Sequence, residues 1–149
     1  MKSLFSPEAY SEIKQRIDQV ESNKPPQWGK MNAAQMIHHC QKPLEVALQK
    51  TTVKKPNIFM GLIMKSFKRM LYNDKPWKQN LPTAKEFIVT DTKDFEKEKT
   101  QLISLLEEFN KKDESVTLPP HPIFGNFTNE QWGKMQYKHL DHHLRQFGV

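Results

Sequence analysis

Residues 128–149 read TNEQWGKMQYKHLDHHLRQFGV and contain the strongest helix signals of the chain. Thr128, followed three positions later by Gln131, forms a capping box, which typically opens an α-helix. Apolar side chains then recur at helical spacing, and a glycine, Gly148, follows Phe147. We therefore predict an amphipathic last helix that closes at Phe147.

Four more helices are expected upstream of this segment, separated by proline-rich loops. They are about residues 7–22, capped by Ser6; residues 32–50, capped by Asn32; residues 57–72; and residues 91–111, capped by Asp91. Only residues 87–90 are strand-like, and residues 73–82 and 112–127 are expected to be loops. Long helices with almost no strand predict an all-α fold, a helical bundle.

The length and composition predict one globular domain over residues 1–149. A single cysteine, Cys40, excludes an intramolecular disulfide framework and fits a reducing compartment. The longest apolar run, residues 58–64, is far shorter than a membrane span of about 20 residues. The opening residues MKSLFSPEAY show no apolar signal region. We therefore expect a cytoplasmic protein.

The net charge of +6 permits an anionic partner without demanding one. The excess is concentrated in residues 54–78, which hold seven basic residues and one acidic residue, Asp74. Such a basic amphipathic helix could lie on an anionic membrane or contact phosphates. We expect instead that its Met/Phe face packs on the bundle, so neither membrane nor nucleic acid is predicted as a partner. Homodimerisation through exposed Met/Phe surface stays open.

Five of the six histidines fall in two clusters on predicted helices. In the last helix, 100° steps place His139 and His143 one turn apart beside the apolar arc, and His142 nearer the polar face. In the second helix, His39 has apolar neighbours and His38 has polar ones. The preference for His39 is modest.

Two histidines from one helix and one from another would supply three neutral nitrogen ligands. Such a set leaves a position open for water or substrate, as in catalytic metal sites, and imidazole suits Zn²⁺ and Ni²⁺. The alternative is that these are ordinary surface or hydrogen-bonded histidines of the bundle.

Three stretches of the chain resemble a bacterial branch of the DinB/YfiT-like superfamily. They are WGKMNAAQMIHHC at residues 28–40, NLPTAKEF at residues 80–87 and HPIFGNFTNEQWGKMQYKHLDHHLRQFGV at residues 121–149. The resemblance implies a four-helix bundle, here with an additional short amphipathic helix, and a metal held by three histidines. When the family's ligand positions are carried over to this sequence, they fall on His39, His139 and His143. His38 stays open, since the doubled histidine leaves the register ambiguous.

The same resemblance implies a metal-dependent enzyme, a hydrolase or a thiol S-transferase, acting on a small molecule that could be a thiol. Gln146 stands where the family often has a glutamine after its second ligand. No catalytic residue and no organic cofactor is predicted. Cys40 lies in the apolar stripe and is expected to be a structural thiol, and His121 is expected to pack within its proline-rich loop. The alternative function is a non-catalytic metal- or ligand-binding bundle, or an interaction protein.

Overall fold

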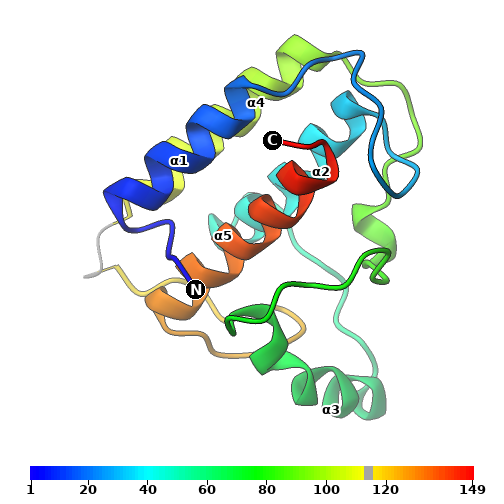
Figure 1. The fold of residues 1–149 in the computed structure, drawn as a ribbon. Coiled ribbons are helices and arrows are strands. Elements are labelled where there is room, and N and C mark those ends of the chain that lie inside the picture. Colours follow the sequence, from blue (N-terminus) through cyan, green and yellow to red (C-terminus); the bar gives the residue numbers. More distant parts are fainter. Residues whose placement is uncertain (113–115) are drawn as a thin grey trace.

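The structure, a computed structural model, describes residues 1–112 and 116–149. In these residues it has five α-helices and two short 3₁₀ helices but no β-strand (Figure 1). The elements are α1 (Pro7–Asp18), α2 (Ala33–Ala47), α3 (Ile58–Ser66), η1 (Lys68–Leu71), η2 (Lys85–Phe87), α4 (Phe95–Asn110) and α5 (Asn129–Gln146). The predicted all-α class is confirmed.

The four long helices pack against one another and enclose the core. α2 lies against α4 and α5, and α1 also contacts α4 and α5 (Figure 1). Each helix turns apolar side chains inward, including the fully buried Ile13, Ile37, Leu102 and Trp132. Burying a side chain of this size stabilises the fold by about 1.5–3 kcal/mol, so these shared faces hold the helices together.

The predicted capping residues of α2 and α5 are confirmed. Asn32 Oδ1 accepts the Gln35 N–H at 2.9 Å, and the Gln35 side chain accepts the Asn32 N–H at 3.0 Å. Thr128 and Gln131 make the same reciprocal pair at the start of α5. Beyond the end of α5, Gly148 adopts a φ of 69°, the left-handed conformation that favours glycine.

Several predicted boundaries are wrong. α1 ends at Asp18 and α2 at Ala47, a few residues before the expected ends. α4 begins at Phe95, because Asp94 and not Asp91 accepts the capping N–H, that of Lys97, at 3.0 Å. The predicted strand at residues 87–90 is absent from the described residues, and residues 85–87 form η2 instead.

The prediction for residues 57–72 is wrong in two respects. The segment is divided into α3 and η1, with Phe67 between them. The apolar face of α3 does not pack on the bundle, because α3 has no buried residue and contacts chiefly η1, whereas Leu71 at the end of η1 packs against the core. The four long helices already cover one another's apolar faces, and α3 stands apart from them in Figure 1. Among the described residues, no helix is long and apolar enough to cross a membrane.

Candidate metal centre

Three histidine side chains meet where α2 faces α5. His39 comes from α2, and His139 and His143 come from successive turns of α5. Their candidate ligand nitrogens all lie within 4.8 Å of one another, and the Nε2 atoms of His39 and His139 are 3.1 Å apart. The three residues are only 4%, 7% and 9% exposed. The structure thus brings together the three histidines predicted as ligands.

Hydrogen bonds fix the protonation of two of the three rings. His39 Nδ1 lies 2.8 Å from the Phe87 carbonyl, which can only accept, so this nitrogen carries the proton. Gln146 Nε2 donates to the Trp28 carbonyl at 2.6 Å, and this contact orients Gln146 Oε1 to accept from His143 Nδ1 at 2.9 Å. Both histidines therefore have an unprotonated Nε2. Hydrogen bonds of this kind orient metal-binding imidazoles.

The third ring, His139, has an unsatisfied polar atom. Within the described residues its buried Nδ1 has no hydrogen-bond partner. Its Nε2 faces the unprotonated Nε2 of His39. Without a cation, a proton on His139 Nε2 would be donated to His39 and would leave Nδ1 unpaired. A proton on His139 Nδ1 would instead leave two Nε2 lone pairs opposing each other. A cation bound by the Nε2 atoms would remove the repulsion. Tetrahedral Zn–N bonds of about 2.0–2.1 Å would place two ligand nitrogens about 3.3 Å apart, close to the observed 3.1 Å. The donor set fits a divalent ion.

Burial keeps all three imidazoles neutral. It lowers the pKa of His39, and it lowers the pKa of His139 well below the usual 6.5, with a further contribution from the neighbouring His143. For His143, burial followed by the effect of His39 lowers the pKa to about 3. Neutral imidazole is the form that binds a metal, so the rings are ready to do so at neutral pH.

The structure separates His38 from His39. His38 Nδ1 lies 2.8 Å from Glu98 Oε2 on α4, and the same oxygen accepts from Gln41 Nε2 at 2.7 Å. His38 therefore joins α2 to α4, whereas His39 points toward α5. This contact was not predicted, because Glu98 lies far away in the sequence and nothing in its local pattern marks it.

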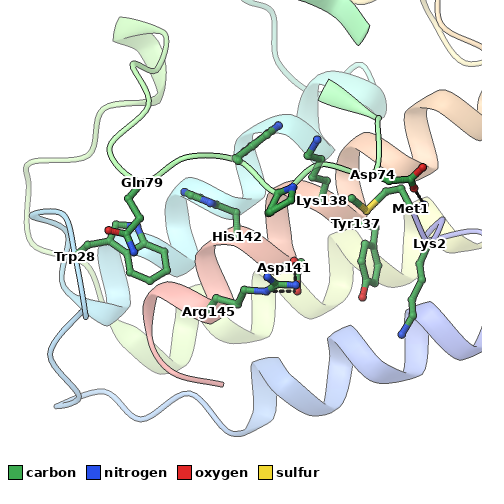
Figure 2. A pocket seen from close by; sticks show the side chains of 12 residues that line it. Met1, Lys2, Trp28, Asp74, Gln79, Tyr137, Lys138, Asp141, His142 and Arg145 are labelled. Atoms are coloured by element: carbon green, nitrogen blue, oxygen red, sulfur yellow. Dashed lines mark hydrogen bonds and ion pairs between the residues drawn. The ribbon is translucent and has the colours of Figure 1, made fainter. Parts of the chain in front are cut away.

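His142 lies outside the three-histidine cluster, beside a pocket. Its ring centroid is 5.7 Å from that of Trp28 and 5.8 Å from that of Trp77. The pocket has a volume of about 480 Å³, and His142 and both tryptophans line it, together with Lys138 and Arg145 (Figure 2). Because Trp77 also lies 5.9 Å from the His139 ring, it borders both the pocket and the cluster.

Two other candidate residues are structural, as predicted. Cys40 is a free thiol that is 1% exposed, and burial raises its pKa, which disfavours the reactive thiolate. His121 stacks on Trp132 with ring centroids 5.3 Å apart, and its Nδ1 accepts the Ile123 N–H at 3.1 Å. Neither residue takes part in the cluster.

Sequence reasoning missed the position of Lys138, which the helical wheel places on the polar face of α5. The structure buries it to 2% exposure under η1 and the loop that follows. Its Nζ donates to the Met70 carbonyl at 2.7 Å and to two oxygens of Asn73. Burial lowers the pKa of Lys138 to about 8. No periodicity could show this, because the covering segment lies elsewhere in the chain.

The fold and the site together define a helical protein with a buried three-histidine centre. The chain belongs to the DUF1569 family, described as a protein of unknown function, whose family model matches residues 5–148. Neither the search of curated proteins nor the search of solved structures gives a match.

Proposed function

We propose that the protein is a metal-dependent enzyme that holds one divalent ion, Zn²⁺ or Ni²⁺, through His39, His139 and His143. The chemistry proposed is that of the DinB/YfiT-like superfamily, hydrolysis or thiol S-transfer on a small molecule. The observation that carries the proposal is the pair of fixed tautomers at His39 and His143, which leaves two Nε2 lone pairs beside a third buried imidazole.

The arrangement of the helices supports the DinB-like part of the proposal. α1, α2, α4 and α5 pack against one another, which is compatible with the four-helix bundle that the sequence resemblance implies, and α3 stands outside them. The histidines that cluster are those that the sequence resemblance implies as ligands. A likeness of sequence and an arrangement of side chains therefore lead to the same three residues.

A divalent ion with three protein ligands keeps a position for a fourth ligand, where it can lower the pKa of a bound water or thiol. The chain's own groups prepare the site for this. The Phe87 carbonyl and Gln146 hold the imidazoles in the binding tautomer, and Trp77 shields His139. In the adjoining pocket both carboxylate oxygens of Asp141 already form ion pairs, one with Arg16 at 2.8 Å and the other with Arg145 at 2.9 Å.

A non-catalytic metal- or ligand-binding bundle is the second candidate, and one observation favours it. In the part of the chain that the structure describes, no carboxylate forms a hydrogen bond or ion pair with the three clustered histidines. The three histidines are thus not held by a carboxylate of the kind that many hydrolytic sites place beside their metal.

Activity measurements on metal-loaded protein distinguish the two candidates. The protein would be loaded with Zn²⁺ or Ni²⁺ and assayed with chromogenic carboxyl and phosphate esters, and with a thiol plus an electrophile. We expect turnover by the loaded protein and none after chelation. The His139→Ala variant should be inactive, whereas His38→Ala should stay active, since His38 faces α4. One bound ion per chain without turnover in any assay would favour the non-catalytic bundle, and failure to bind an ion would contradict both the enzyme and a metal-binding bundle.

A further inference from the structure

The outward face of α3 is apolar although it lies at the surface. Ile58, Phe59 and Leu62 are 88%, 74% and 63% exposed. At 100° per residue, these three positions fall within about 100° of arc, so their side chains share one face. Figure 1 shows α3 projecting from the rest of the molecule. Large apolar side chains that are exposed side by side on one face mark an interaction site.

Unpaired positive charge lies on the same part of the chain. Four exposed basic residues lie on α3 or directly next to it: Lys54 and Lys55 precede the helix, Lys65 lies on it and Arg69 lies in η1. Over residues 1–112 and 116–149, none of them forms an ion pair. The segment's acidic residue, Asp74, is already paired with the N-terminal amine. We call the apolar face with these four cations the α3 surface.

The combination of apolar face and charge selects the kind of partner. A second copy of the chain would bring two strongly positive surfaces together, and like charges repel. Nucleic acid would satisfy the cations, but Ile58 and Leu62 would stay in water because aliphatic side chains offer no ring on which bases stack. An anionic lipid bilayer can bind both the apolar face and the cations, since the apolar side chains enter the acyl boundary while the cations contact the headgroup phosphates.

We propose that the α3 surface binds reversibly to anionic lipid bilayers, with α3 lying in the plane of the interface. The sequence predicts no membrane partner, but that prediction assumed that the apolar face packs on the bundle, and the structure exposes it. The proposal is independent of the metal centre and of any activity there.

Vesicle co-sedimentation of the full chain tests this proposal. The probes are vesicles of phosphatidylcholine alone and vesicles that also contain phosphatidylglycerol. We expect binding only to the second kind, and weaker binding as salt screens the charges. Replacing Lys54, Lys55 and Lys65 together by Gln should lower the affinity by about a hundredfold. The double variant Phe59→Ser/Leu62→Ser should lower it by at least about tenfold.

Matched control variants carry the same changes elsewhere on the surface. Ile88→Ser/Val116→Ser removes two other exposed apolar side chains, and replacing Lys30, Lys97 and Lys111 by Gln removes the same charge. Both controls should bind as the unchanged protein does. Equal binding to both vesicle types, no binding to either, or an equal loss in the controls would overturn the proposal. So would a dimer in light scattering that Phe59→Ser/Leu62→Ser dissociates while vesicle binding persists.

Discussion

Gln146 and Gly29 together set the position of the His143 imidazole. Gln146 accepts from His143 Nδ1 and donates to the Trp28 carbonyl. Gly29 has a φ of 84°, and a Cβ built there would overlap the Gln146 amide nitrogen. A larger residue at position 29 would therefore displace Gln146 and, through it, His143.

The first prediction concerns the hydrogen bond to His143. Gln146→Ala should weaken metal binding by about 10–100-fold, because the imidazole loses the contact that orients it. Gln146→Glu keeps an acceptor for Nδ1–H and should lose less. Competition with a chromogenic chelator measures both affinities. Equal affinity in Gln146→Ala and the unchanged protein would show that the contact does not prepare the site.

A second prediction concerns pH and the metal-free protein. Burial lowers the pKa of His143 to about 3 and that of His121 to about 4, from 6.5 in the unfolded chain. Between about pH 6.5 and 3 the unfolded chain therefore binds more protons than the folded chain. The contribution of these two histidines to the free energy of unfolding is fully present above about pH 6.5 and is lost as pH falls toward 4 and then 3. Urea unfolding at several pH values measures the decline.

His121→Asn provides the matched comparison, because Asn Oδ1 can accept the N–H groups that His121 Nδ1 accepts. Its free energy of unfolding should fall less steeply between pH 6.5 and 4 than that of the unchanged protein. Identical slopes would contradict the assignment of a buried, neutral His121.

At the scale of the helices, two asparagine caps occupy different settings. Asn32 caps α2, which carries His39 and much of the core, whereas Asn57 caps α3, which has no buried residue. Asn32→Ala should lower the free energy of unfolding by about 1 kcal/mol, and Asn57→Ala should leave it nearly unchanged. Denaturant unfolding of both variants measures this, and an equal loss would mean that α3 is coupled to the core.

Local sequence patterns predicted much of the local structure, although they gave Asp91 and not Asp94 as the cap of α4. The Asn32 and Thr128 caps and the one-turn spacing of His139 and His143 depend only on nearby residues, and the structure contains all three features. The helical spacing of residues 32–50 also favoured His39 over His38, because His39 has apolar neighbours, but the preference was small.

The failures that concern burial and exposure have a different cause. Helical periodicity shows which side chains share a face, but not which segment covers that face. Lys138 is buried because η1 lies over α5, and α3 is exposed because no helix lies over it. The apparent strand near Phe87 is an instance of the same limit, since its backbone carbonyl accepts from His39 and not from a neighbouring strand. Such contacts join residues far apart in the chain.

For the whole molecule, we predict that the metal is not needed for folding. The four long helices bury an apolar core without help from the histidines. Far-UV circular dichroism should therefore show full helicity after chelation, with a lower melting temperature, because an ion that binds only the folded state stabilises it by mass action. Loss of the helical signal on chelation would mean that the ion holds the fold together, as in structural zinc domains.

The most direct test of the three-histidine centre is metal titration of the unchanged protein and five single variants at pH 7.5. We predict one Zn²⁺ or Ni²⁺ per chain, with tight binding lost in His39→Ala, His139→Ala and His143→Ala. Tight binding should persist in His38→Ala and His142→Ala, whose rings face Glu98 and the two tryptophans. No binding by the folded protein at micromolar metal, or loss of the ion in His142→Ala with retention in His143→Ala, would contradict the proposed centre.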